Sequence, residues 1–157
     1  MPGAMMLLRS WKSLNTDLNR TTALDLLPED IEKLIKASKK ALAFSSPLYS
    51  GFRVGAAVAA GDGRLFTGCN IENLSLTLNA CAERVAVLKA LSEGATDLRA
   101  IAVTSETGET CYPCGSCRQL LFEYAPGIKV VLPSRHSITV LDLKELLPMP
   151  FIKKIKK

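Results

Sequence analysis

Two short cysteine motifs, far apart in the chain, constrain its fold more than any other feature. The first reads CAER at residues 81–84, and the second reads PCGSCR at residues 113–118. Cys81, Cys114 and Cys117 supply three thiols, one fewer than a closed structural zinc site requires. A fold that joins the two motifs would therefore create a zinc site with one open coordination position, which is typical of catalytic sites.

Glu83 lies two residues after Cys81, in the first turn of a predicted helix. From there it could exchange a proton with a water on the metal without replacing a ligand. A first-turn glutamate also complements the helix dipole, and this is the simpler explanation for a glutamate considered alone. Beside three metal-binding thiols, the catalytic explanation is favoured.

Both cysteine motifs fall at predicted helix starts, where the helix dipole lowers the pKa of a thiol. Three thiolates on one zinc ion would leave a net negative charge. Arg84 and Arg118 are placed to offset that charge by donating hydrogen bonds to sulfur. An ordinary ion pair is an equally good explanation for either arginine.

Three other residues are possible ligands. Cys111 extends the second motif, so a shifted ligand pair remains open, although the helix start after Pro113 favours Cys114 with Cys117. Cys69 ends a predicted strand and is expected to be a small packed residue. His136 lies in a polar loop and is expected at the surface. A fourth ligand would turn the site into a closed structural one.

Hydrophobic periodicity and turn residues predict a single α/β domain. The expected helices cover residues 28–42, 81–92, 116–124 and 142–147, and the expected strands cover residues 52–60, 64–70, 100–104, 129–132 and 138–141. Helices interleaved with five strands favour a three-layer α/β/α sandwich. In the helix over residues 81–92, we expect the inward face to carry Ala82, Val85, Leu88 and Leu91.

The net charge of +5 comes from the ends of the chain. Residues 28–152 carry 13 basic and 13 acidic residues, and the surplus lies in an N-terminal extension (residues 1–27) and a basic tail (residues 153–157). The extension weakly resembles a transit peptide, but a disordered or docking segment is favoured. A neutral body does not favour nucleic acid, and no apolar run is long enough to span a membrane. Five cysteines, three in metal-ligand spacing, favour a reducing compartment, and we expect the cytoplasm.

Five motifs together resemble the cytidine deaminase family, in its small, all-cysteine, homotetrameric branch. They are SGFRVGAA at residues 50–57, GCNIEN at 68–73, CAER at 81–84, PCGSCRQ at 113–119 and ELLP at 145–148. The resemblance implies a mixed five-stranded sheet, one Zn²⁺ per subunit and a homotetramer. It also implies hydrolytic deamination of cytidine and deoxycytidine to uridine and deoxyuridine in pyrimidine salvage, with Glu83 moving the protons.

The same resemblance assigns binding roles. Asn70 and Glu72, on either side of Ile71, would hold the sugar hydroxyl groups. Phe52 would line the base pocket, and the backbone at Ala82 and Cys114 would bond the pyrimidine edge. Phe151 would cover the base of a neighbouring subunit. For Phe52 and Phe151, packing in the core is the alternative.

One segment departs from the family pattern. Residues 74–77 read LSLT where the family usually has a tyrosine near the pocket. This change motivates an alternative substrate, namely a modified cytosine nucleoside or a blasticidin-like antibiotic. The basic tail motivates an alternative of another class, a nucleic-acid-binding protein, and a structural zinc protein is the remaining one.

Overall fold

Residues 26–152 are the part of the chain that this computed structural model describes. The tail at residues 153–157, and all but the last two residues of the extension, therefore lie outside the described residues. In chain order the elements are α2 (Pro28–Ala41), η2 (Leu42–Phe44), β1 (Val54–Ala60), β2 (Leu65–Cys69), η3 (Leu76–Leu78), α3 (Ala82–Ser92), β3 (Leu98–Ser105), α4 (Gly115–Tyr124), β4 (Lys129–Pro133), β5 (Ile138–Asp142) and α5 (Leu143–Leu146). Within residues 26–152, no helix has the length and apolar character that crossing a membrane requires.

The strands form one mixed sheet in the order β2-β1-β3-β4-β5. Neighbouring strands are antiparallel except for β3 and β4, which are parallel. Parallel strands need a crossover connection, and α4 provides it between β3 and β4. The expected five-stranded mixed sheet is confirmed.

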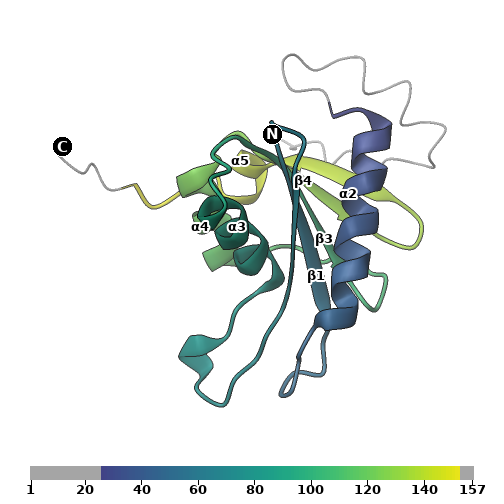
Figure 1. The fold of residues 1–157 in the computed structure, drawn as a ribbon, viewed down its shortest axis with the longest axis vertical. Helices are drawn as coiled ribbons and strands as arrows, with labels where there is room; N and C mark the ends of the chain where they lie inside the picture. The colour runs from purple at the N-terminus through teal and green to yellow at the C-terminus, as the bar shows by residue number, and fades with distance from the viewer. Residues whose placement is uncertain (1–25, 153–157) are drawn as a thin grey trace.

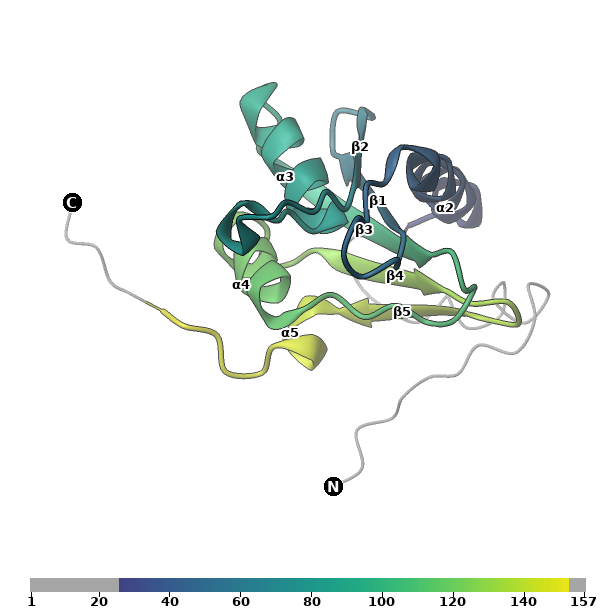
Figure 2. The same cartoon turned by 90° about the horizontal axis from the view of Figure 1, so that it is seen from below.

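Helices cover both faces of the sheet (Figure 1). On one face α2 packs through Ile31 and Leu34 against Ala57 of β1 and Val131 of β4. On the other face lie α3 and α4, and the view in Figure 2 separates the three layers. The predicted three-layer sandwich is therefore confirmed.

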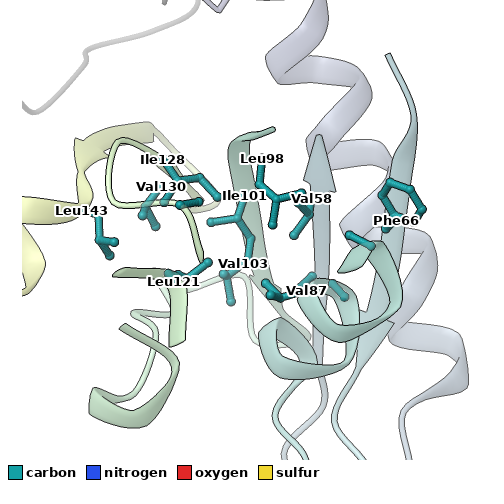
Figure 3. Packing of buried hydrophobic residues seen from close by; sticks show 14 of the residues in the cluster. Val58, Phe66, Val87, Leu98, Ile101, Val103, Leu121, Ile128, Val130 and Leu143 are labelled. Carbon is teal, nitrogen blue, oxygen red and sulfur yellow. The ribbon is translucent and has the colours of Figure 1, made fainter. Parts of the chain in front are cut away.

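The larger core lies between the sheet and the layer that contains α3 and α4 (Figure 3). Val58, Ile101 and Val130 project from three neighbouring strands toward this layer. Val87 of α3 and Leu121 of α4 are fully buried in the same cluster. Each buried side chain of this size stabilises the fold by about 1.5–3 kcal/mol, so the core holds both helices against the sheet.

The buried face of α3 differs from the one expected. Leu88 is 49% exposed, so its predicted inward position was wrong, and Val85 and Leu91 are only partly buried. The apolar residues that are buried are small: Ala82, Ala86, Val87 and Ala90. The reason lies in β2, because a Cβ atom at Gly68 would overlap the backbone of α3 at Ala82. The side of α3 that lies against Gly68 therefore carries Ala82 and Ala86, and Leu88 is not among the residues that contact this glycine.

Pairing in the sheet brings two loops to one edge. Since β2 and β3 both pair antiparallel with β1, their carboxyl ends lie at the same edge. Gly55 of β1 lies opposite Cys69 at the end of β2 and opposite Thr104 near the end of β3. The segments that follow, which carry the GCNIEN motif and the second cysteine motif, therefore meet there.

Candidate metal centre and active site

The three predicted zinc ligands come together where two helices begin. The sulfur atoms of Cys81, Cys114 and Cys117 all lie within 4.8 Å of one another, and those of Cys81 and Cys114 are 3.9 Å apart. Cys81 is the N-cap residue of α3 and Cys114 that of α4, while Cys117 lies buried in the first turn of α4. This is the one group of three or more potential metal ligands that residues 26–152 form.

The helix starts create a positive environment for these sulfurs. Neither N-cap side chain makes a capping hydrogen bond with its own helix. The first-turn N–H groups of α3 and α4 therefore keep their partial positive charge at the cluster. Such an environment stabilises thiolates, as the sequence predicts.

The pKa values of the thiols of Cys81 and Cys117 are shifted in opposite directions. A hydrogen bond from Cys117 is the main reason that the pKa of Cys81 is lowered to about 6, with further contributions from Cys114 and the charge of Arg84. The same hydrogen bond, together with burial, raises the pKa of Cys117 far above its ordinary value. One thiolate thus forms readily and repels a second. A divalent cation removes this repulsion, and three sulfur donors suit zinc, so the residues fit the ion.

Glu83 is buried beside the cluster. It is the second residue of α3 and its exposed fraction is 4%. Burial first, and then the charge on Cys81, raise the pKa of its carboxyl group to about 7. An acid that only complements a helix dipole has no need to be buried, whereas a group that exchanges protons near neutral pH can act as both base and acid.

The other possible ligands lie outside the three-sulfur group. Cys111 is half-buried, and burial raises the pKa of its thiol to about 11. Cys69 is buried at the end of β2, as expected for a packed residue, and His136 is exposed. The shifted ligand pair containing Cys111 is therefore not the one that the fold assembles.

A cavity of about 310 Å³ opens onto this cluster. Its lining joins Cys81, Glu83 and Cys114 with the polar side chains of Asn70 and Glu72. The predicted residues Phe52, Ile71 and Ala82 also line it. A polar subsite and a metal site therefore share one cavity of ligand-binding size.

Several lining residues escaped prediction: Ser50, Val54, Asn79, Ala80, Cys111 and Tyr112. Ser50 lies within one of the five motifs, and Tyr112 directly precedes the Pro-Cys turn. Their closeness to these motifs in the sequence could have suggested that both residues line the cavity. Asn79 and Ala80 reach the cavity because Ala80 pairs with Ile71 across the intervening loop. No local pattern indicates that pairing.

The side chain of Asn70 joins three segments of the site. Its Oδ1 accepts hydrogen bonds from the hydroxyl of Ser45 (2.6 Å) and the backbone N–H of Val54 (2.9 Å). Its Nδ2 donates to the carbonyl oxygen of Phe52 at 2.8 Å. Both acceptor positions of the oxygen are thus used, and one N–H remains for a ligand.

The two arginines donate their hydrogen bonds to the main chain, so the expected hydrogen bonds to sulfur are not formed among the described residues. Arg84 donates to the carbonyl oxygen of Asn79 at 3.2 Å. Arg118 donates to the carbonyl oxygens of Pro113 (2.7 Å) and Leu146 (2.9 Å), which ties the cysteine turn to α5. Arg84 contributes its charge to the lowered pKa of Cys81.

Phe151 does not line the cavity of its own chain. Its backbone is held by the side chain of Gln119 through two hydrogen bonds, of 2.9 and 3.0 Å, and its exposed fraction is 72%. Leu74, Leu76 and Leu78, in the loop that departs from the family pattern, are also largely exposed.

A cluster of three thiols beside a buried carboxyl group, inside an α/β sandwich, defines a catalytic zinc site and not a structural one. Comparison with known proteins then gives the family. A sequence model described as the cytidine and deoxycytidylate deaminase zinc-binding region matches residues 28–132. The chain belongs to this family.

Individual relatives agree with the match. The cytidine deaminase of Sporosarcina psychrophila is 43% identical over 126 residues, which cover 79% of this chain and 93% of that one. The cytidine deaminase of Halalkalibacterium halodurans is 44% identical, covering 78% and 94%. The crystal structure of cytidine deaminase from Burkholderia pseudomallei aligns with a TM-score of 0.72 at 42% identity, over 76% of this chain and 98% of the other.

Proposed function

We propose that this protein is a zinc-dependent cytidine deaminase, which hydrolyses cytidine and deoxycytidine to uridine and deoxyuridine with release of ammonia. The observation that carries the proposal is a single cavity that reaches the three-thiol cluster through Cys81 and Cys114 and is also lined by the buried Glu83 and the polar pair Asn70 and Glu72. Pyrimidine salvage is the usual role of this reaction.

Cys81, Cys114 and Cys117 would hold the zinc. When bound, the ion supplies the Lewis acidity that activates a water for attack on C4 of the cytosine ring. Glu83 accepts a proton in that step and delivers one to the ring nitrogen N3. It then takes the remaining proton from the hydroxyl group added at C4 and passes it to the exocyclic amine, so that the C4–N bond breaks, ammonia leaves and the C4 carbonyl of uridine forms. The pKa of about 7 suits a group that must be both deprotonated and protonated within one cycle.

The remaining residues position the nucleoside. Asn70 and Glu72 bind the sugar hydroxyl groups, Phe52 and Ile71 contact the base or sugar, and the backbone at Ala82 bonds the pyrimidine edge. Their shared position in the cavity lining supports these roles. We retain Arg84 and Arg118 as residues that offset the charge of the thiolates.

A nucleoside is favoured over a nucleotide. The family description covers both cytidine and deoxycytidylate, but no Lys or Arg is among the described residues that line the cavity. Glu72 is held as an anion there, because hydrogen bonds from the hydroxyl and backbone N–H of Ser50 and from the N–H of Tyr49 lower its pKa. A phosphate group would meet negative charge and no cation to bind it.

We further propose that residues 28–152 form the catalytic domain of a cytoplasmic homotetramer in which Phe151 covers the base bound by a neighbouring subunit. The exposed ring of Phe151 and the exposed leucines of residues 74–78 support an assembly that buries them. Reduced thiols at the metal site favour the cytoplasm.

A modified cytosine nucleoside is the second candidate substrate. Leu74 and Leu76 stand in the segment that departs from the family, and Asn79, at the end of the same loop, lines the cavity. A bulkier or more apolar nucleoside could exploit that change.

One assay tests the proposed reaction and its substrate. Purified protein is incubated with cytidine, deoxycytidine, deoxycytidylate and base-modified cytosine nucleosides, and ammonia release is measured. Cytidine and deoxycytidine should react and deoxycytidylate should not. Glu83→Gln should retain zinc and fold while losing about 10²–10⁴-fold in kcat. Inert cytidine beside a reactive modified nucleoside would favour the second candidate, and full activity in the glutamine variant would remove Glu83 from the mechanism.

A further inference from the structure

The turn that precedes β1 is bonded to the segment that follows β2. The backbone N–H of Ser46 donates to the carbonyl oxygen of Asn70 at 2.9 Å, and the N–H of Glu72 donates to that of Ser46 at 3.0 Å. Two extended segments thus lie side by side at the rim of the cavity. Ser50, at the end of the turn, also lines the cavity.

The carboxylate of Glu72 is held almost entirely by this turn. Its Oε2 accepts hydrogen bonds from the backbone N–H groups of Tyr49 (2.8 Å) and Ser50 (2.9 Å). Its Oε1 accepts a short hydrogen bond from the hydroxyl of Ser50. Among the described residues, Ser50 is the one whose side chain bonds this carboxylate, and it alone bonds Oε1.

Each carboxylate oxygen accepts about two hydrogen bonds. Oε2 therefore has no free acceptor position, whereas Oε1 has one that a ligand in the cavity could use. The two backbone bonds hold Oε2 in place. The hydroxyl of Ser50 adds the hydrogen bond that holds Oε1, the oxygen with the free position.

The hydroxyl of Ser50 is itself fixed. It accepts a hydrogen bond from the backbone N–H of Phe52 at 3.1 Å. This bond requires the chain to turn back at the intervening Gly51, whose φ of +66° is readily adopted by glycine. The chain thus holds the serine oxygen in place before any ligand arrives.

We propose that Ser50 is a positioning residue for sugar recognition: its hydroxyl orients Glu72 so that one oxygen of the carboxylate can accept a hydrogen bond from a sugar hydroxyl group. This inference rests on the proposed function and extends it to a residue that does not itself touch the reacting atoms. The substrates that depend on Ser50 are cytosine nucleosides with free sugar hydroxyl groups.

The test compares a ligand that has the 2′- and 3′-hydroxyl groups of the sugar with one that lacks both and keeps only the 5′-hydroxyl group. Ser50→Ala, Ser50→Thr, Glu72→Ala and the double variant Ser50→Ala/Glu72→Ala are prepared with their metal. KM and kcat are measured for cytidine, and 2′,3′-dideoxycytidine is measured as a competitive inhibitor, so that a poor substrate still gives a value. Ser92→Ala, an exposed serine at the far end of α3, is the matched control.

Ser50→Ala should raise KM for cytidine roughly tenfold, which corresponds to one lost hydrogen bond to a charged group, with kcat changed less than about twofold. Its inhibition constant for the dideoxynucleoside should equal that of the wild type. Ser50→Thr keeps the hydroxyl and should restore most of the affinity. In the Glu72→Ala variant, removal of the serine hydroxyl should not raise KM for cytidine any further.

Equal losses for both nucleosides, or additive losses in the double variant, would overturn the proposal, since Ser50 would then act on the fold in general. A wild-type protein that deaminates no cytosine nucleoside would refute the proposed function instead, and this inference with it. An active wild type with an unaffected Ser50→Ala variant would refute the inference alone.

Discussion

At the scale of single residues, the site depends on a glycine that allows close packing as well as on the side chains that carry the chemistry. This glycine is Gly68. A Cβ atom there would overlap the carbonyl oxygen of Ala82 and the backbone nitrogen of Ala86, which are parts of a rigid helix. Ala82 stands between Cys81 and Glu83, so close packing at Gly68 sets how near the sheet these two residues lie.

Gly68→Ala should therefore impair both folding and catalysis. Moving α3 away from β2 disrupts packing, and we expect a loss of about 1–3 kcal/mol in the free energy of unfolding, measured by urea denaturation. Activity should fall more than stability explains, because Glu83 moves with the helix. Gly127→Ala is the control, since an added methyl group meets nothing within 4 Å. Equal activity in the two variants would show that the site tolerates movement of α3.

Residue-scale prediction was most specific where chemistry and spacing coincide. The gathering of the three thiols could be predicted from the sequence because metal ligation restricts both residue type and position, and Glu83 lies buried beside them. The outward position of Leu88 could not be predicted, because a large apolar residue suggests burial, whereas the contact of α3 with Gly68 depends on tertiary packing and places Ala82 and Ala86 inward. Likewise the role of Ser50 depends on a turn folding back on Glu72, and no local pattern encodes that contact.

At the scale of elements, the ends of helices and strands carry the function. Helices α3 and α4 present their N-termini to the thiols, and the ends of β2 and β3 bring the cavity loops together. These elements could be predicted because caps and periodicity are local signals. The order of strands in the sheet depends on long-range pairing, so local signals could not give it, and the family resemblance implied only a mixed five-stranded sheet.

The short helix α5 gives a pH-dependent test at this scale. Asp142 caps it through a capping box with Glu145 and also pairs with Lys129 at 2.7 Å. The hydrogen bond from Lys129 is the main cause of its lowered pKa. A group whose pKa is lower in the folded state contributes stability above its unfolded pKa, and this contribution is lost as the pH falls through the folded value.

Asp142→Asn keeps a side chain that can cap the helix and removes the charge. It should lower the free energy of unfolding by about 0.5–1 kcal/mol at pH 7, and the difference from wild type should shrink below about pH 4. Urea unfolding of both proteins at pH 7 and pH 3 measures this, and any shared effect of pH on the metal site cancels. Asp97→Asn, which breaks an exposed pair with Arg99, should change stability by less than about 0.5 kcal/mol at either pH. If Asp142→Asn lowers the free energy of unfolding by the same amount at pH 7 and pH 3, the result would contradict the assigned role of the ion pair.

At the scale of the whole molecule, residues 149–152 lie outside the cavity lining of their own chain. Gln119 clamps the backbone of Phe151 to α4, which leaves the ring exposed, and the neighbouring Met149 is 90% exposed. Apolar side chains held outward by fixed hydrogen bonds suit a surface that a second copy covers. The proposed tetramer would use this surface to complete the site of a neighbour.

Mixing two defective proteins tests that arrangement. Phe151→Ala should raise KM for cytidine roughly tenfold through loss of an aromatic contact, and Glu83→Gln should be almost inactive. In mixed assemblies of the two, about a quarter of the sites would combine an intact Glu83 with an intact Phe151 from a neighbour. At substrate concentrations well below KM, the mixture should therefore show several times the average activity of its parents. Sedimentation of each protein reports the assembly independently. Activity equal to the parental average, from assemblies shown to be mixed, would mean that Phe151 does not act across the subunit boundary.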